Sequence, residues 1–83
     1  MPKVLIDFLG YAFFFWSNEE GRPRIHVCKG KPSHSSAKFW ITSDGVVLAH
    51  NNAQIPSSDL KRLYAYIHQN RQRILAARAD HFA

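Results

Sequence analysis

The chain has 83 residues, of which 46% are hydrophobic and 13% aromatic, a content that is typical of one small folded domain and excludes a disordered chain. Its formal net charge of +5 suits an anionic partner such as nucleic acid or an acidic protein. The single cysteine, Cys28, excludes an internal disulfide and fits a reducing cytoplasm.

The N-terminal segment does not resemble a signal peptide, because Asp7 and Gly10 interrupt its apolar run. No stretch approaches the roughly 18 apolar residues that a membrane-spanning helix requires. We therefore expect a cytoplasmic protein without a membrane segment, folded as a single α+β domain over residues 1–83. A second copy of the chain would stabilise such a small core, so a homodimer is one partner hypothesis.

Four or five short strands are predicted over residues 3–50. The first is the apolar run Val4–Leu9, which Gly10 ends. The second, Tyr11–Ser17, is so aromatic that both of its faces must be partly covered. The polar segment Asn18–Pro23 then favours a turn.

The later strands alternate between apolar and polar residues. In Arg24–Lys29, Ile25 and Val27 point to one face, and the opposite face carries Arg24, His26 and Cys28. After a loop over Gly30–Ser35, Ala37–Thr42 alternates in the same way, and Val46–His50 follows the turn at Ser43-Asp44-Gly45. Such short connections favour an antiparallel meander.

One long C-terminal helix is predicted over about residues 58–80. The segment Pro56-Ser57-Ser58-Asp59 favours a helix start with a serine cap and an acidic residue in the first turn. An apolar stripe at helical spacing should cover one face of the sheet and comprises Leu60, Leu63, Tyr64, Ile67, Ile74 and Leu75.

Two arginines, Arg71 and Arg78, project into the middle of this stripe on a straight helix. One explanation is that the helix extends beyond the sheet, so that the arginine stems lie across apolar surface. The other is that Arg71 reaches a carboxylate, either Glu19 or Glu20 of the turn or an acidic group on a partner.

His26 is the histidine best placed for chemistry. The neighbouring Arg24 would disfavour the imidazolium, and a neutral imidazole can act as a general base. Glu19 could then orient it or donate a proton, while Arg24 and Arg71 could stabilise charge on a phosphate. A metal-independent nuclease is therefore one hypothesis, and a purely structural histidine is the other. No set of His, Asp and Glu has metal-ligand spacing, so neither a metal nor another cofactor is expected.

Aromatic and cationic residues interleave along the predicted strands. This composition is typical of surfaces that stack bases and follow phosphates, although core packing alone would also account for the aromatic residues. The candidate nucleic-acid contacts are Arg22, Arg24, Lys29, Lys31, Lys38, Trp40 and Arg71.

Several motifs, in this order, resemble the domain of unknown function 4160 family over nearly the whole chain. They are Tyr11-x-Phe13-Phe14-Phe15-x-Ser17-Asn18-Glu19, Pro23-x-Ile25-His26-Val27, Ala37-Lys38-Phe39-Trp40-Ile41, and Asn70-Arg71 in the terminal helix. The family commonly has a second histidine where Arg24 stands and a tryptophan near the position of Arg78.

The resemblance implies a small prokaryotic toxin of a two-gene toxin–antitoxin module that acts on or binds nucleic acid. It also implies an antitoxin partner of the domain of unknown function 2442 type, and a basic toxin would suit an acidic antitoxin electrostatically. Asn18, Arg71 and Arg78 are the candidate partner contacts. The alternative hypothesis is a non-catalytic module that binds nucleic acid or protein.

Overall fold

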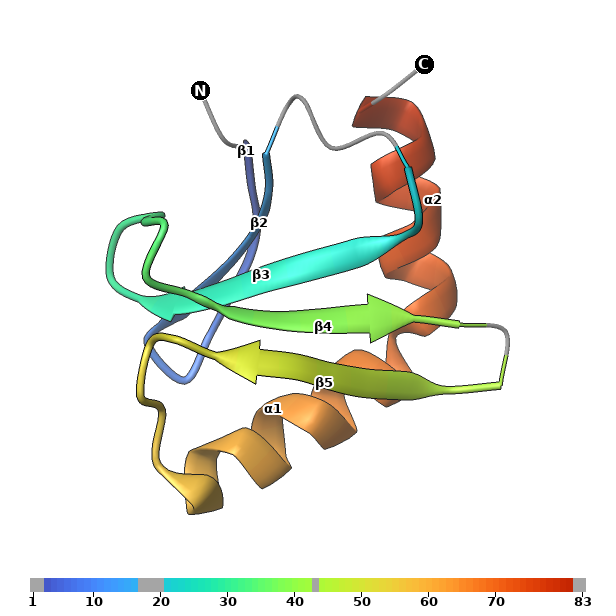
Figure 1. The fold of residues 1–83 in the computed structure, drawn as a ribbon. Coiled ribbons are helices and arrows are strands. Elements are labelled where there is room, and N and C mark those ends of the chain that lie inside the picture. The colour runs from blue at the N-terminus through green and yellow to red at the C-terminus, as the bar shows by residue number, and fades with distance from the viewer. Residues whose placement is uncertain (1–2, 17–20, 43, 82–83) are drawn as a thin grey trace.

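The computed structural model describes residues 3–16, 21–42 and 44–81, and it confirms an α+β fold (Figure 1). The elements follow one another as β1 (Lys3–Phe8), β2 (Tyr11–Phe15), β3 (Arg24–Lys29), β4 (Ala37–Ile41), β5 (Val46–Asn51), α1 (Ser57–Gln69) and α2 (Arg71–His81).

The five strands form one antiparallel meander with the spatial order β1-β2-β3-β4-β5. β1 and β2 are joined by a two-residue connection in which Leu9 and Gly10 have φ angles of 56° and 78°. Positive φ at both central residues is the pattern of a type I′ turn, which matches the twist of the flanking strands. Gly10 therefore supports a hairpin at the position where the sequence predicted a break.

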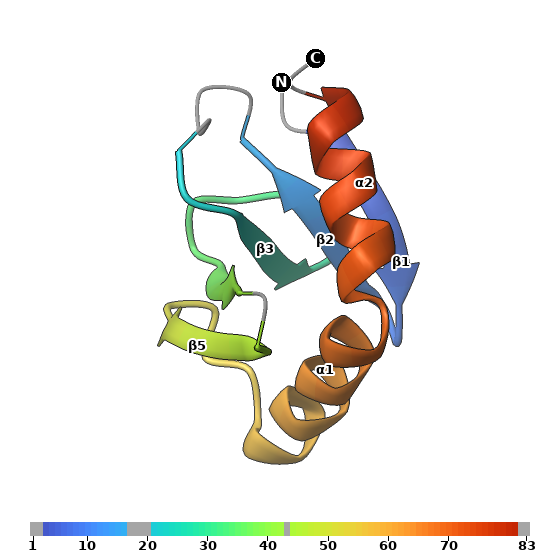
Figure 2. The ribbon, with the colours of Figure 1, turned by 90° about the vertical axis from the view of Figure 1, so that its right-hand side faces the viewer.

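Both helices lie on the same face of the sheet (Figure 2). The core between the two layers contains the alternate residues Tyr11, Phe13 and Phe15 of β2, together with Ile25 and Val27 of β3. The helices contribute three fully buried side chains, Leu63, Ile67 and Ile74. The predicted stripe thus covers the sheet, except that Tyr64 remains 42% exposed.

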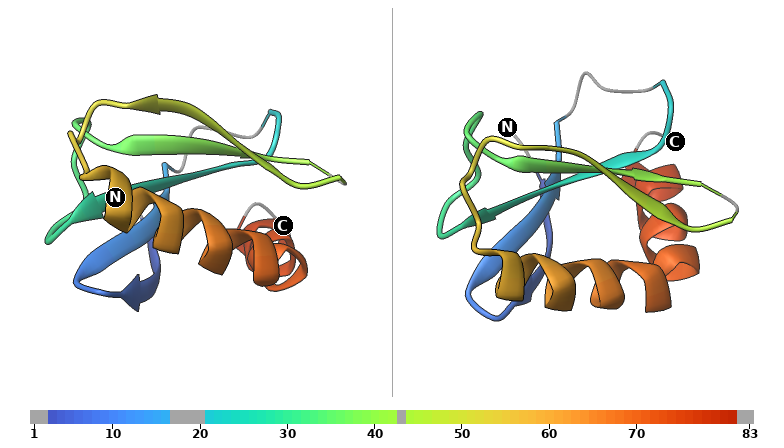
Figure 3. Two further views of the ribbon diagram at one scale, coloured as in Figure 1. Left: turned by 90° about the horizontal axis from the view of Figure 1, so that it is seen from below. Right: turned by 60° about the horizontal axis from the view of Figure 1, so that its bottom comes forward.

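The helical region consists of two helices rather than the single helix predicted over residues 58–80. Asn70 leaves the helical conformation with φ −109° and ψ 19°, and its side-chain amide donates to the Tyr66 carbonyl at 2.8 Å. An asparagine side chain that competes for a backbone carbonyl in this way favours a helix end. The chain consequently changes direction after α1, which runs beneath β5, and α2 lies at the end of the sheet where β3 begins (Figure 3).

The predicted serine cap of the helix is also wrong. α1 begins at Ser57, the cap position is Pro56, and no side chain caps the helix. Asp59 does lie in the first turn as predicted, where the helix dipole favours a negative charge. Its carboxylate accepts a 2.7 Å hydrogen bond from the Tyr11 hydroxyl, which ties the start of α1 to β2.

Candidate functional site

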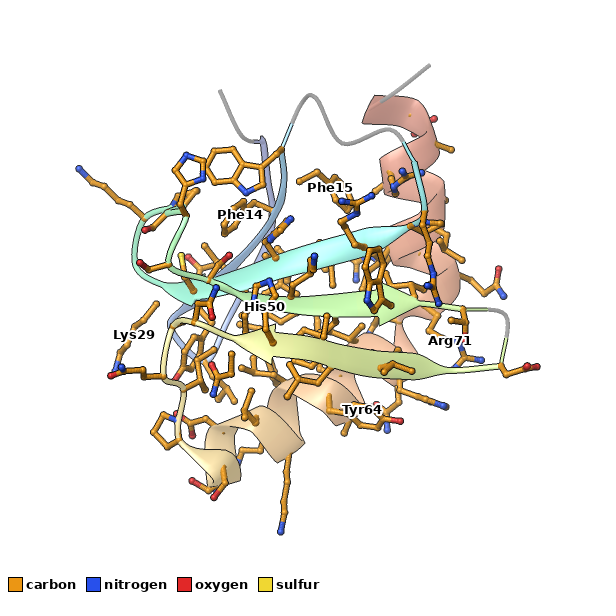
Figure 4. All side chains as sticks on the ribbon, viewed as in Figure 1. Phe14, Phe15, Lys29, His50, Tyr64 and Arg71 are labelled. Carbon is orange, nitrogen blue, oxygen red and sulfur yellow. The ribbon has the colours of Figure 1, made fainter. Side chains whose placement is uncertain are left out.

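The candidate site lies on the sheet face opposite the helices, which we call the outer face. Strand register places Phe14, His26, Lys38 and His50 in one row across β2, β3, β4 and β5. Because strand residues alternate between faces, the burial of Ile25 and Val27 in the core fixes His26 on the outer face. Phe14 and His50, the two ends of this row, are labelled in Figure 4.

Three cations gather around one indole on the outer face. The guanidinium carbons of Arg22 and Arg24 lie 4.7 Å and 4.9 Å from the Trp40 ring centroid. The Lys38 ammonium lies 4.7 Å from the same centroid. We call these four residues the Trp40 cluster.

Strand geometry explains why the Trp40 cluster forms. Arg24 and Trp40 are register partners on β3 and β4, and Lys38 lies two residues before Trp40 on the same face. Arg22 comes from the turn before β3, and its carbonyl accepts a 3.1 Å hydrogen bond from Arg24 Nε. The cluster therefore combines two adjacent strands and the turn that precedes them.

The Trp40 cluster concentrates positive charge on a partly exposed aromatic ring. Each cation gains a cation–π attraction of about 0.5–1 kcal/mol at an exposed site. The three cations also lie within about one Debye length of one another at physiological salt, so they repel each other. A phosphate bound beside the ring would be attracted by all three positive charges, so the cluster is suited to a phosphate group.

His26 lies deeper in the same face and is covered on several sides. Its side chain is 6% exposed, and its Nδ1 lies 3.3 Å from the Ser36 hydroxyl. Its ring stacks on Phe14 at a centroid distance of 5.6 Å, and Trp16 contacts it edge-on at 6.3 Å. The arrangement holds the imidazole in place within packed aromatic rings.

The loop between β3 and β4 covers this part of the face. His34 stacks on Trp16 with a centroid distance of 4.4 Å and an interplanar angle of 9°. The Cys28 thiol donates to the Lys31 carbonyl at 2.9 Å. Burial raises the pKa of the Cys28 thiol, against a smaller opposing effect of the Ser33 backbone, so the thiol is a poor nucleophile at neutral pH.

The structure does not bring together all the residues that the sequence proposed for catalysis. His26 lies on the outer face, whereas Arg71 lies on the helical side and its Nη1 contacts the His68 ring and carbonyl, both at 2.9 Å. Glu19 and Asn18 lie outside the described residues. It is Arg78 that contacts the turn before β3, where it donates to the Gly21 carbonyl at 2.7 Å.

The candidate nucleic-acid residues fall into separate groups. Arg22, Arg24, Lys38 and Trp40 form the Trp40 cluster, while Lys29 and Lys31 are exposed around the opposite end of β3. Figure 4 shows Lys29 and Arg71 at opposite ends of the sheet. The Trp40 cluster is therefore the main concentration of predicted contacts among the described residues.

Sequence reasoning missed an apolar hollow between β5 and α1. It has a volume of about 260 Å³ and is lined by Phe39, Leu48, Leu60, Lys61 and Tyr64. The available signal was the Val46-Val47-Leu48 run, because a strand with three successive apolar residues must present at least one on each face.

Two kinds of feature are absent from the described part of the chain. No group of three or more His, Cys, Asp or Glu side chains there lies close enough to hold a metal ion. No helix there is long and apolar enough to cross a membrane.

Comparison with known proteins identifies one family. The family model described as "Domain of unknown function (DUF4160)" matches residues 10–77, which include β2 to β5, α1 and most of α2. No curated protein and no solved structure matches the chain significantly.

Proposed function

We propose that this chain, which belongs to the DUF4160 family, is a nucleic-acid-binding protein whose main contacts are made by the Trp40 cluster. The observation that supports this proposal is the convergence of Arg22, Arg24 and Lys38 on one partly exposed indole. The net charge of +5 would add long-range attraction to any polyanion.

Single-stranded RNA or DNA is the ligand that best suits this geometry. Its unpaired bases can stack on an indole or a guanidinium plane, and its phosphates can be held by the adjacent cations. Arg24 and Lys38 flank Trp40 on one face of the sheet, so successive nucleotides could contact aromatic and cationic groups in turn.

Binding is better supported than cleavage. A general base must come within hydrogen-bond reach of the proton that it removes. The His26 imidazole is 6% exposed and its Nδ1 already faces the Ser36 hydroxyl, so it offers little surface to a substrate.

The proposal is tested by measuring how tightly a fluorescent ten-nucleotide oligouridine binds at increasing salt. If Arg22, Arg24 and Lys38 each contact one phosphate, the logarithm of the association constant should fall linearly with the logarithm of the salt concentration, with a slope of roughly −2. Lys38→Ala should make the slope shallower by about 0.7, since one phosphate contact is lost. Trp40→Leu should weaken binding by about tenfold, as expected for the loss of one stacking platform.

Arg73→Ala is the matched control, because Arg73 is an exposed cation of α2 on the helical side. It should leave both the affinity and the slope nearly unchanged. Equal effects of Arg73→Ala and Lys38→Ala would mean that binding depends on overall charge, and the Trp40 cluster would then not be the site.

We also propose that the protein is the toxin of a toxin–antitoxin module and is neutralised by a small acidic partner, an expectation that rests on the family resemblance and the net charge of +5. Induced expression in a bacterial host should then arrest growth, and co-expression of the product of the adjacent gene should relieve the arrest. Unimpaired growth at confirmed protein levels would contradict this proposal.

Two variants distinguish a binding toxin from a nuclease toxin. Trp40→Leu should abolish the growth arrest, while His26→Ala should retain it if His26 is structural. Ser36→Ala removes the same hydrogen bond as His26→Ala but keeps the imidazole, and thermal unfolding of all three variants reveals any loss of folding. An arrest lost only in a well-folded His26→Ala variant would favour the nuclease hypothesis.

A further inference from the structure

β5 is an edge strand whose outer side carries few protecting features, apart from a register shift at Ala49 in its ladder with β4. Among the described strands it pairs only with β4, and Val47 and Leu48 are 54% and 40% exposed. Its sequence, Val-Val-Leu-Ala-His-Asn, contains no lysine, acid or proline. Natural edge strands usually carry such residues because they prevent another strand from pairing.

The hydrogen-bond pattern leaves backbone groups of β5 directed outward. Thr42 and Gly45 exchange backbone hydrogen bonds of 2.8 Å and 3.3 Å at the turn that leads into β5. Pairs in an antiparallel ladder alternate between bonded and non-bonded, so Leu48, three residues further, directs its N–H and C=O away from β4. A further strand could therefore pair with β5 at this position.

The two faces beside this edge differ in chemistry. On the helical face, the hollow is lined by four apolar or aromatic side chains and the single cation Lys61. Figure 4 shows Tyr64 beneath β5 on this side. On the outer face, Val47 is the register partner of Trp40, and His50 is the register partner of Lys38. On the outer face, the cations therefore begin one strand away from β5, with Lys38 of β4, whereas the helical face is apolar.

We propose that β5 binds an extended segment of another protein in which apolar and acidic residues alternate. Successive side chains of a strand point to opposite faces, so the apolar residues would enter the hollow. The acidic residues would lie on the outer face next to Val47 and His50, about 10 Å from Lys38 and Trp40 on β4, where the positive charge of the Trp40 cluster attracts them. A second copy of the chain fits less well, because its β5 carries no acidic residue and each copy has a net charge of +5. The proposal does not depend on nucleic-acid binding.

The test uses a labelled ten-residue peptide that alternates valine and glutamate, with binding followed by fluorescence anisotropy. Two control peptides isolate the two requirements. One replaces every glutamate by lysine, and the other carries N-methyl groups on its central amides, so that it cannot form the strand ladder. Both controls should bind at least about tenfold more weakly than the acidic peptide, because each lacks one set of contacts.

Variants of the protein locate the site. Tyr64→Ala should weaken binding of the acidic peptide by about fivefold, since a partly exposed aromatic lining the hollow is lost. Leu9→Ala is the matched control, because Leu9 is 49% exposed on the β1–β2 turn, far from β5. Leu48→Glu should abolish peptide binding but leave oligouridine binding unchanged, which separates this site from the Trp40 cluster.

Three outcomes would overturn the proposal. The first is equal binding of the acidic and N-methylated peptides, which would exclude strand pairing. The second is an equal effect of Tyr64→Ala and Leu9→Ala, which would place the peptide elsewhere. The third is a dimer in light scattering that Leu48→Glu converts to a monomer, which would identify a second copy as the occupant of β5.

Discussion

At the scale of single residues, the hydrogen bond from Tyr11 to Asp59 joins parts of the chain that are 48 positions apart. The bond requires a protonated Tyr11 hydroxyl. The accepting Asp59 carboxylate, together with burial, raises the Tyr11 pKa above its usual value of 10.0. Ionisation of Tyr11 is therefore more difficult in the folded protein than in the unfolded chain.

This pKa shift predicts a specific pH dependence. A raised pKa stabilises the folded state fully below pH 10, and the contribution is lost as the pH rises through the folded pKa. Tyr11→Phe should therefore lower the free energy of unfolding by about 1 kcal/mol at pH 7. The difference from the wild type should narrow above pH 10, as measured by urea unfolding between pH 7 and pH 11.

The control for this measurement is Tyr64→Phe, because the Tyr64 side chain is 42% exposed. Its unfolding free energy should follow that of the wild type at every pH. A gap between wild type and Tyr11→Phe that stays constant up to pH 11 would show that the hydroxyl contributes through packing rather than through its proton.

Residue patterns predicted the face of His26 but not its burial. Alternation along β3 is a local property, so Ile25 and Val27 could be assigned to one side and His26 to the other. The cover over His26 comes from Trp16 and from Ser36 in a loop ten residues away. A loop's path over a sheet depends on tertiary packing, which the period of a strand does not encode.

At the scale of elements, the division at Asn70 determines which arginine meets the turn before β3. A straight helix over residues 58–80 would keep one angular phase. For such a helix, one hypothesis is that Arg71 reaches a carboxylate of this turn. Asn70 changes the direction of the chain, so Arg71 contacts His68 while Arg78 reaches the Gly21 carbonyl. The sequence identified both arginines as unusual but could not assign their contacts.

Packing of α2 against the sheet depends on Ile74, which is fully buried. Figure 4 shows Phe15 pointing toward this helix. Ile74→Ala should lower the free energy of unfolding by about 2–4 kcal/mol through lost transfer energy and the cavity that remains. For a chain of this size that is a large fraction of the total, since domains are stable by about 0.05–0.15 kcal/mol per residue.

Leu75→Ala provides the control for Ile74→Ala, because its side chain is only partly buried beside the same core. Its effect on chemical unfolding should be about 1 kcal/mol, in proportion to the smaller buried area. Equal effects of the two substitutions would mean that α2 packs differently from the arrangement described above.

At the scale of the whole molecule, the order of elements was predictable and the functional surface only partly so. Short connections and alternating strands were enough to predict the meander and the helical layer. The Trp40 cluster was partly predictable because Lys38 and Trp40 are two residues apart and share a face. The exposed edge of β5 was not predictable. Leu48 and Tyr64 are left exposed by the position of α1 against the sheet, which is a matter of tertiary packing.

The connections of this fold also suggest an order of folding. Every strand pairs with its neighbour in the sequence, so each hairpin closes only a short loop, which forms quickly and costs little entropy. The bonds Tyr11–Asp59 and Gly21–Arg78 instead close loops of 48 and 57 residues. During synthesis on the ribosome, the hairpins can therefore assemble early, whereas the Gly21–Arg78 contact beside Arg22 must wait until residue 78 has emerged.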